Sequence, residues 1–404
     1  MLDHPTYFAA RDELLARVSP VGTETVPLLR CAGRVLAADL TAAEDIPAFD
    51  RSPYDGYAFR AADTAGAALT APVTLRILEE VAAGSVPTMA VTPGTATKIL
   101  TGAPIPEGAD AVINYEATKY TADTVQLFER ASAGMNIVRR GDDVKRGALL
   151  AKDGDLIDAG TAGTLAAQGV TEPRVYRVPR VGVLSTGSEL VEAGETPRPG
   201  MIRNSNAWSI SAALATAGLE PVYLGIARDT VEGVAGLIAA GLASCDAVVS
   251  TGGVSVGDYD MTPAAMDAVG AETLVRGVLL KPGMACAYGV KDGKLICALS
   301  GNPASSITNL YTVALPALKR LAGRTDALPQ EIDLAIDRGF PKKSGVTRVL
   351  RGALAIVNGR ATLRLPASQG NVVLSSTIGC NAMAFIPAGS GALAAGTILK
   401  GFLI

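Results

Sequence analysis

The hydrophobic positions of the chain follow different patterns in different regions. Between residues 179 and 326, short apolar runs alternate with longer segments in which apolar residues recur at helical spacing. The runs begin near Val181, Val222, Ala247 and Leu295, and the helical segments cover residues 206–217, 231–242, a stretch from Thr262, and 303–322. Because such alternation builds a mostly parallel sheet with helices on both faces, this region is predicted to be a doubly wound α/β domain.

Two other regions show short β-rich runs that are interrupted by proline and glycine. Between about residues 71 and 152 the predicted strands are 73–81, 96–100, 111–114 and 125–129. From about Pro329 they are 332–336, 347–353, 360–365 and 382–386. The first region is predicted to be a small β domain and the second a C-terminal β-barrel.

Helical spacing also marks residues 7–18 and 156–168, and two prolines mark a linker at 172–179. A chain of 404 residues is too long for one ordinary core, so we expect a multi-domain protein of α/β plus β type. The predicted domains are an N-terminal helical and linker domain (1–45 and 145–178), the small β domain (46–144), the α/β domain (179–326) and the C-terminal barrel (327–404).

The stretch from Asp246 to Thr262 carries the first candidate chemistry. A short buried strand ends at Gly252 and Gly253, whose backbone N–H groups could approach an anion without a Cβ in the way. The hydroxyl groups that could donate to the same anion are those of Ser250, Thr251 and Ser255. The two carboxylates that follow, Asp258 and Asp260, suggest Mg²⁺ beside a phosphate. Thr262 and Pro263 then predict the N-cap and first residue of a helix, while a tight turn is the alternative interpretation of the two glycines.

Two more predicted strands end in glycine and polar residues. One is followed by Ser185, Thr186, Gly187, Ser188 and the acidic Glu189. The other is followed by Gly301, Asn302 as a helix N-cap and Pro303 as the first helical residue. In an open α/β sheet such strand ends gather in one crevice where ligands bind. Asp229, after the second strand, is either a helix cap or an acid of this site.

The amino-acid composition excludes several classes of ligand and of catalytic site. The formal net charge of −3 argues against binding to nucleic acid or to a membrane surface, so an anionic ligand needs local basic groups. The five cysteines form no Cys-x-x-Cys pair, and His4 is the single histidine, which excludes a zinc site of that kind and a Ser-His-Asp triad. No apolar run approaches the roughly 18 residues of a membrane span, and no signal peptide is visible, so we expect a cytoplasmic protein.

Four segments together carry a family resemblance: Ser185-Thr-Gly-Ser-Glu189, Ser250-Thr-Gly-Gly-Val-Ser-Val-Gly-Asp-Tyr-Asp260, Leu280-Lys-Pro-Gly283 and Leu299-Ser-Gly-Asn-Pro303. They resemble the molybdopterin-binding domain of molybdenum cofactor biosynthesis proteins. The chain as a whole resembles molybdopterin molybdenumtransferase, the MoeA and gephyrin E-domain family, nearly from end to end. The resemblance implies that the α/β domain binds molybdopterin.

The resemblance also implies site residues outside the α/β domain. Asp55 and Thr101 match family positions in Ser52-Pro-Tyr-Asp-Gly-Tyr-Ala58 and in the Thr101-Gly-Ala-Pro104 loop, with Tyr54 in place of the usual methionine. Without the resemblance, Asp55 is interpreted as a turn-former. Asp143 matches the family aspartate, beside Arg139 and Arg140, which could meet an anionic ligand or be a solvated charged turn. Asn371 stands where the family commonly has serine, and we expect it to keep a hydrogen bond to the ligand.

The reaction that the resemblance implies is the transfer of molybdate onto the dithiolene of adenylylated molybdopterin, with Mg²⁺-dependent release of AMP. Molybdate and phosphate are oxyanions, so hydroxyls and cations suit them, while Glu189, Asp229, Asp258 and Asp260 could hold Mg²⁺. The family commonly has a second lysine where this chain has Met284, so Lys281 is expected to carry more of the anion binding. The alternative for Met284 is a place in the core beside Cys286.

Family members are elongated homodimers, which implies that Asp55, Thr101 and Asp143 face the α/β domain of the partner subunit. Handover contacts with a molybdopterin adenylyltransferase and with cofactor-accepting enzymes are also implied. Two other functions are weighed: a molybdopterin adenylyltransferase, whose single-domain members lack the flanking β domains, and a non-catalytic binding scaffold like gephyrin. The sequence does not distinguish molybdate from tungstate or identify the acceptor enzyme.

Overall fold

The computed structural model describes residues 1–254 and 261–404 and divides into two compact units. The larger unit comprises Met1–Ala38, Asp153–Gly163 and Thr171–Ile404, and the smaller one Asp39–Lys152 and Thr164–Val170. The α/β region and the C-terminal barrel both belong to the larger unit. The four predicted domain boundaries stay predictions.

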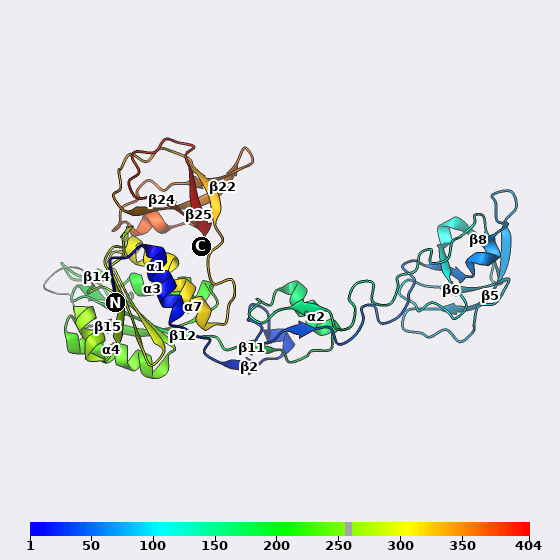
Figure 1. Cartoon of the computed structure of the whole chain (residues 1–404), viewed down its shortest axis with the longest axis horizontal. Helices are drawn as coiled ribbons and strands as arrows, with labels where there is room; N and C mark the ends of the chain where they lie inside the picture. Colours follow the sequence, from blue (N-terminus) through cyan, green and yellow to red (C-terminus); the bar gives the residue numbers. More distant parts are fainter. Residues whose placement is uncertain (255–260) are drawn as a thin grey trace. The chain divides into compact units, whose positions relative to one another are not determined.

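A seven-stranded sheet lies at the centre of the larger unit (Figure 1). In spatial order its strands are β1 (Leu2–Asp3), β17 (Glu272–Arg276), β19 (Cys286–Lys291), β20 (Lys294–Leu299), β16 (Ala247–Thr251), β12 (Arg180–Thr186) and β15 (Glu220–Ala227). The last four run parallel to one another, while β19 is antiparallel to both of its neighbours. Parallel strands covered on both faces are apolar throughout, which is the pattern that the sequence shows.

Helices cover both faces of this sheet. They are α1 (Tyr7–Ala16), α3 (Asn206–Thr216), α4 (Val231–Ser244), α5 (Met261–Ala268), α6 (Pro303–Asn309), the π-helical turn η4 (Leu310–Ala314) and α7 (Leu315–Leu321). Alternate residues of β16 serve the two faces: Val249 packs in the core that holds residues of α1, α3 and α7, and Val248 packs in the core that holds residues of α4 and α5. The predicted doubly wound α/β architecture is therefore confirmed.

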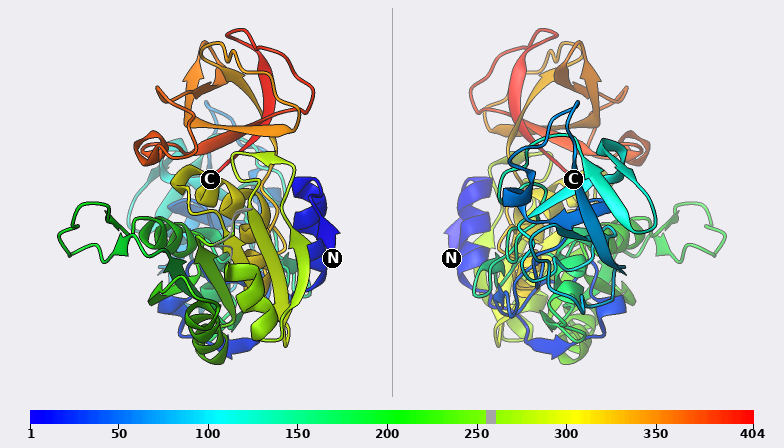
Figure 2. Two further views of the ribbon diagram at one scale, coloured as in Figure 1. Left: turned by 90° about the vertical axis from the view of Figure 1, so that its left-hand side faces the viewer. Right: turned by 90° about the vertical axis from the view of Figure 1, so that its right-hand side faces the viewer.

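The C-terminal strands form the predicted barrel. These are β22 (Thr347–Val357), β23 (Arg360–Arg364), β21 (Ile332–Ile336), β25 (Ile398–Leu403) and β24 (Ala382–Ile386), and pairing of β24 with β22 closes the ring (Figure 2). The short strand β18 (Leu280–Lys281) extends from the α/β region and pairs in parallel with β22. A segment of the α/β region is thus held against the barrel in a fixed register.

The smaller unit contains the predicted small β domain. Its six-stranded sheet has the order β7 (Ala111–Asn114), β4 (Gly56–Phe59), β6 (Thr95–Ile99), β5 (Val73–Val81), β9 (Thr124–Leu127) and β8 (Thr118–Tyr120). The strands β3 (Leu40–Thr41) and β10 (Leu149–Ala151) form a separate pair. In the larger unit β2 (Thr23–Thr25) pairs with β11 (Arg174–Tyr176), and β13 (Leu190–Val191) with β14 (Ile202–Arg203). The remaining elements are α2 (Ala159–Ala167) and the short 3-10 helices η1 (Leu28–Arg30), η2 (Ala61–Thr64), η3 (Tyr115–Ala117) and η5 (Leu374–Thr377).

One helix prediction is corrected and another is refined. Thr262 was expected to cap a helix, but it lies inside α5, is buried, and donates its hydroxyl hydrogen to Gly252 O at 3.2 Å. The helix predicted over 303–322 is present as one continuous helical run of α6, η4 and α7, in which η4 is a π-helical turn. Pro316 at the start of α7 has no N–H to continue the helical hydrogen bonds, which accounts for the π-helical turn before it.

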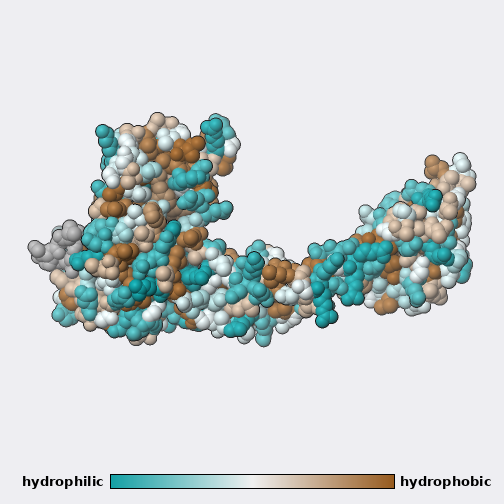
Figure 3. Space-filling model, viewed as in Figure 1, coloured by the Kyte–Doolittle hydropathy of each residue, from teal (hydrophilic) through white to brown (hydrophobic). Residues whose placement is uncertain are grey.

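No helix within the described residues is both long enough and apolar enough to cross a membrane. Hydrophilic and hydrophobic residues are intermixed over the face drawn in Figure 3.

Candidate functional site

The ends of three parallel strands meet at one edge of the α/β sheet, as predicted. The hydroxyl oxygens of Ser185, at the end of β12, and Thr251, at the end of β16, are 2.8 Å apart. Gly301, after β20, lies so close to Gly252 that a Cβ on it would stand 3.5 Å from the Gly252 Cα. A cavity of about 80 Å³ opens here, and its walls include Thr186, Glu189, Thr251, Gly301 and Pro303.

The two glycines after β16 are required by close packing. Gly252 has a φ of +96° and Gly253 a φ of +64°, values that L side chains rarely adopt. A Cβ on Gly252 would stand 2.3 Å from Thr186 O, and one on Gly253 would stand 2.7 Å from Thr262 Oγ1. The Gly252 N–H donates to Leu299 O at 3.0 Å, so this N–H is already used inside the protein. Anion binding by these glycines stays a prediction.

Asp229 contacts Thr186, a wall residue of this cavity, and is not the helix cap. Its carboxylate accepts hydrogen bonds from Thr186 Oγ1 at 2.7 Å, from Ser188 N at 2.7 Å and from Ser188 Oγ at 2.8 Å. Burial raises the pKa of Asp229, but these hydrogen bonds outweigh it and lower the pKa below its usual value. The cap of α4 is Thr230, whose hydroxyl accepts from Gly233 N at 3.0 Å.

The predicted metal ligands are only partly described. Glu189 is exposed at the rim of the strand-end cavity, and Gly187 before it would place a Cβ 2.7 Å from the Glu189 carboxylate. Ser255, Asp258 and Asp260 lie outside the described residues. Across 1–254 and 261–404, no group of three or more His, Cys, Asp or Glu side chains could hold a metal. Ser250 is buried at the end of β16, and its Oγ has no hydrogen-bond partner among the described residues.

A second cavity, of about 360 Å³, gathers positive charge. Among the residues that the structure describes, its walls include Lys281, Lys342 and Arg348 and no acidic residue. Lys281 on β18 and Arg348 on β22 are partners in register across the two strands, so two cations stand side by side. None of the three forms an ion pair with another described residue. Arg348 stacks over Phe340 at 5.5 Å, and its Nε is buried without a partner in the described part of the chain.

Several predicted residues line the same cationic cavity. Met284, Asn302 and Asn371 are among its wall residues, so Met284 is half-buried at the cavity and not packed in the core. Gly283 before it has a φ of +114°, and the Gly283 carbonyl accepts from Asn309 Nδ2 at 2.7 Å. The Asn371 carbonyl accepts from Ala304 N at 3.0 Å, which joins this loop to the start of α6.

Lys342 and Arg348 were missed by the sequence analysis. Both lie in or beside a predicted β region without a motif around them, and only the pairing of β18 with β22 brings Arg348 to Lys281. A basic residue in a predicted strand, followed by the apolar Val349 and Leu350, is the one signal that the sequence offered for Arg348.

In the smaller unit, Asp55 and Thr101 are in direct contact. The Asp55 carboxylate accepts from Thr101 N at 2.7 Å and from Thr101 Oγ1 at 2.8 Å, although the residues are 46 positions apart. These two hydrogen bonds lower the pKa of Asp55 below its usual value, and the bond from the Thr101 backbone N–H has the larger effect. Both residues are exposed, so the pair forms a polar surface feature of this unit.

Asp143, Arg139 and Arg140 lie on an exposed turn of the smaller unit. The Arg139 guanidinium donates to Asp50 at 2.7 Å, and Arg140 Nε donates to Asp45 at 2.5 Å. Both charges are thus already compensated by carboxylates. Asp143 N donates to Ile46 O at 3.0 Å, which fixes the turn. Ligand binding by these three residues stays a prediction.

The chain is a multi-domain protein, and two parts of it match families of molybdenum cofactor biosynthesis. Residues 6–169 match the family described as the MoeA N-terminal region (domain I and II), and residues 182–320 match the one described as a probable molybdopterin binding domain. Together with the relatives described next, these matches show that the chain belongs to the molybdopterin molybdenumtransferase family.

The relatives agree over nearly the whole chain. A molybdopterin molybdenumtransferase of Staphylococcus aureus (strain Mu50 / ATCC 700699) is 34% identical over 372 residues, which cover 92% of this chain and 89% of that protein. One of Staphylococcus epidermidis (strain ATCC 12228 / FDA PCI 1200) is 33% identical over 367 residues, 91% and 88% of the two chains. The crystal structure of the molybdopterin biosynthesis moeA protein from Pyrococcus horikoshii OT3 has a TM-score of 0.86 at 30% identity, and covers 99% of this chain and 100% of that one.

Proposed function

We propose that the protein transfers molybdate onto the dithiolene of adenylylated molybdopterin and releases AMP, and that the cationic cavity binds the oxyanion. The observation that carries the proposal is the placement of Lys281 directly across from Arg348, with Lys342 on the same cavity. Like charges directly opposite each other on neighbouring strands destabilise a sheet. An anion bound between them turns this repulsion into charge-assisted hydrogen bonding.

The neutral groups around the cations suit a tetrahedral oxyanion. Ser300, Asn302 and Gln369 also line the cavity and offer hydroxyl and amide groups. Gln369 is held in place because its Nε2 donates to Arg351 O at 2.7 Å and its Oε1 accepts from Arg351 N at 3.2 Å. Fixed donors cost little reorganisation when charge develops on a ligand. No nucleophilic side chain of the protein is needed for this reaction.

Mg²⁺ would be held by Asp258, Asp260 and Glu189. Carboxylate oxygens are the ligands that this hard cation prefers, and the exposed Glu189 carboxylate fits such a role. When bound, the ion would neutralise phosphate charge on the leaving AMP. Asp260→Ala is expected to abolish AMP release that depends on Mg²⁺ while the protein stays folded.

A homodimer completes the proposed site. The family resemblance supports an arrangement in which Asp55, Thr101 and Asp143 of one subunit act at the α/β domain of its partner. The Asp55 and Thr101 pair presents one ionised carboxylate that is fixed by a loop of the same unit.

The test is anaerobic incubation with adenylylated molybdopterin, Mg²⁺ and either molybdate or tungstate, with AMP as the measured product. AMP release that requires both the oxyanion and Mg²⁺ is the expected result. ATP-dependent adenylylation of molybdopterin would instead show an adenylyltransferase. Ligand binding without AMP release under any of these conditions would contradict the proposal and favour a scaffold.

A further inference from the structure

The side-chain amide of Asn204 is held in one orientation from both ends. Asn204 Oδ1 accepts from Ala207 N at 3.3 Å, and a backbone N–H can only donate. Asn204 Nδ2 donates to Tyr223 Oη at 3.2 Å, and Tyr223 in turn donates to the Glu192 carboxylate at 2.8 Å. Burial, and then the hydrogen bond to Glu192, raises the pKa of Tyr223 to about 12, so the phenol keeps its proton. The oxygen of Asn204 therefore points away from Tyr223.

This orientation fixes the hydroxyl hydrogens of two site residues. Ser185 Oγ is 2.9 Å from Asn204 Oδ1, which has no hydrogen, so Ser185 must donate. Ser185 has one hydrogen, so in its 2.8 Å contact with Thr251 Oγ1 it can only accept, and Thr251 must donate. The three side chains are 0% to 1% exposed, so bulk solvent does not compete for these hydrogen bonds. Thr251, a wall residue of the strand-end cavity, therefore has no hydroxyl hydrogen left for a ligand.

The hydroxyl hydrogen of Thr186, another wall residue of this cavity, is also used inside the protein, but by a different acceptor. Its hydroxyl donates its one hydrogen to Asp229 Oδ1 at 2.7 Å. Thr186 can thus offer only lone pairs to a ligand.

One more wall residue of this cavity adds an acceptor. Asn206 donates through Nδ2 to Gly301 O at 2.8 Å. Asn206 Oδ1 is left buried without a partner among the described residues. Thr186, Thr251 and Asn206 thus have acceptor atoms and no free hydroxyl hydrogen at the strand-end cavity. Its wall also includes the Ser205 hydroxyl and the Arg203 guanidinium, whose Nε donates to Glu195 O at 3.0 Å. The cationic cavity differs, because its wall holds Lys281, Lys342 and Arg348.

We propose that Asn204 is a positioning residue that sets the hydroxyls of Ser185 and Thr251, and that the strand-end cavity recognises a hydrogen-bond donor: the amino-substituted edge of the pterin ring, not a phosphate. This inference rests on the proposed function, since that function supplies a pterin as the ligand. It differs from the expectation that these hydroxyls donate to phosphate, because their hydrogens are already used inside the protein. A ligand edge that carries N–H groups meets lone pairs, whereas an edge that carries oxygen meets repulsion.

The test compares two fluorescent probes by titration: pterin, and lumazine, in which oxygen replaces the exocyclic amino group. The wild-type protein is expected to bind pterin at least about ten-fold more tightly than lumazine. Asn204→Asp keeps an acceptor facing Ser185 and is expected to keep the preference. Asn204→Ala frees the Ser185 hydrogen, and Ser185→Ala frees that of Thr251, so each is expected to lose most of it. Melting curves show whether each variant folds. If Asn204→Ala does not fold, Ser185→Ala tests the proposal in its place.

Three results would overturn the proposal. One is a wild-type protein that binds lumazine as tightly as pterin, or binds neither. Another is an unchanged preference in Asn204→Ala or in Ser185→Ala. The third is that Mg²⁺ alone displaces pterin from the wild-type protein but not from Thr251→Val. That result would make the cavity a cation site. AMP release is measured on the same wild-type preparation. It tests the proposed transfer reaction, whereas the comparison of pterin with lumazine tests only the proposed preference of the strand-end cavity, so the two proposals can fail separately.

Discussion

At the scale of single residues, Met284 tests whether the cationic cavity holds an anion. It lines that cavity together with Lys281 and Lys342. Met284→Lys adds a cation that would meet an oxyanion directly, and we expect molybdate to bind more tightly by about 1 to 3 kcal/mol. Calorimetric titration with molybdate measures the change, and Met284→Leu, which keeps an apolar side chain of similar size, is the matched control. A weaker or unchanged affinity in a well-folded Met284→Lys protein would contradict the placement of the anion.

The direction of the hydrogen bonds at the strand ends could not be predicted from the sequence. The sequence indicated that Ser185, Thr186 and Thr251 belong to the site, because each follows a predicted buried strand. The direction of their hydrogen bonds depends on Asn204, 19 positions after Ser185, and on Asp229, 43 positions after Thr186. Such partners are chosen by the fold, so the sequence could place the hydroxyls but could not tell donors from acceptors.

At the scale of elements, the close approach of β12 and the loop after β16 depends on Gly252. A Cβ there would meet Thr186 O at 2.3 Å, and the φ of +96° is strained for any other residue. Gly252→Ala is expected to lower the free energy of unfolding by at least about 2 kcal/mol. Gly236→Ala is the control, because Gly236 lies in α4 where an added Cβ would meet nothing within 4 Å, and a helical alanine is expected to be neutral or stabilising. Equal effects of the two changes on urea denaturation would refute the packing argument.

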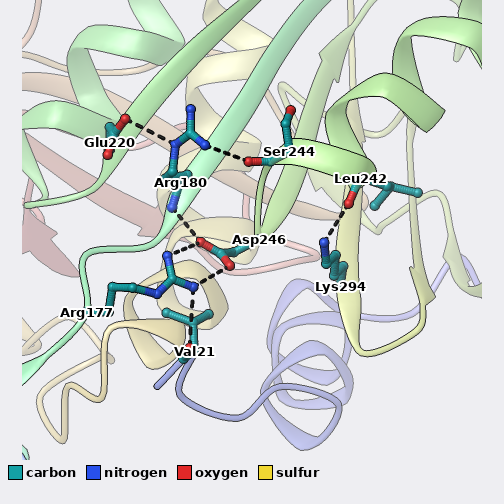
Figure 4. A network of polar contacts seen from close by, with 8 residues as sticks. All are labelled: Val21, Arg177, Arg180, Glu220, Leu242, Ser244, Asp246 and Lys294. Atoms are coloured by element: carbon teal, nitrogen blue, oxygen red, sulfur yellow. Dashed lines mark hydrogen bonds and ion pairs between the residues drawn. The ribbon is translucent and has the colours of Figure 1, made fainter. Parts of the chain in front are cut away.

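The start of β16 is tied to its surroundings by Asp246 (Figure 4). Its carboxylate accepts from Arg177 Nη2 at 2.7 Å and from Arg180 N at 2.8 Å. Burial raises the pKa of Asp246, but these contacts outweigh burial and hold the pKa below its usual value. The stabilisation is therefore present at neutral pH and is lost as the pH falls through the lowered pKa.

Asp246→Asn is accordingly expected to cost about 1 to 2 kcal/mol of stability at pH 7. The difference from the wild-type protein should shrink as the pH falls below about 4, the ordinary range of the group, because the wild-type carboxyl then takes up a proton. Denaturation curves at several pH values measure this. A difference that stays constant down to the most acidic pH would show that Asp246 acts through shape and not through charge.

The elements themselves were largely predictable. The bounds of β5 and β7 agree with the predicted 73–81 and 111–114, because alternating or apolar runs bounded by glycine and proline leave few other choices. The N-cap at Thr262 was wrong because a threonine before a proline can also serve inside a helix when its hydroxyl reaches a carbonyl, here that of Gly252. The pairing of β18 with β22 could not be predicted from the sequence. It joins segments that are far apart in the chain, and a strand of two residues is too short to show a hydrophobic periodicity.

At the scale of the whole molecule, the proposal of a composite site in a homodimer has a direct test. Asp55→Ala and Lys281→Ala proteins, each folded and each expected to be inactive, are co-expressed with different tags so that heterodimers can be isolated. One of the two sites in a heterodimer then contains both wild-type residues, and we expect up to about half of the wild-type rate of AMP release. Failure of the purified heterodimer to regain activity would show that both residues act within one subunit.

The measurement that tests the account most directly is molybdate binding to a pair of neighbouring lysine variants. Lys342 lines the cationic cavity, whereas Lys343, its exposed neighbour with the same charge, is not among the wall residues. Calorimetric titration is expected to show that Lys342→Ala weakens molybdate binding by about ten-fold, that Lys281→Ala weakens it at least as much, and that Lys343→Ala leaves it unchanged. Equal affinities of the Lys342→Ala and Lys343→Ala proteins, together with wild-type affinity in Lys281→Ala, would contradict the assignment of this cavity to the oxyanion.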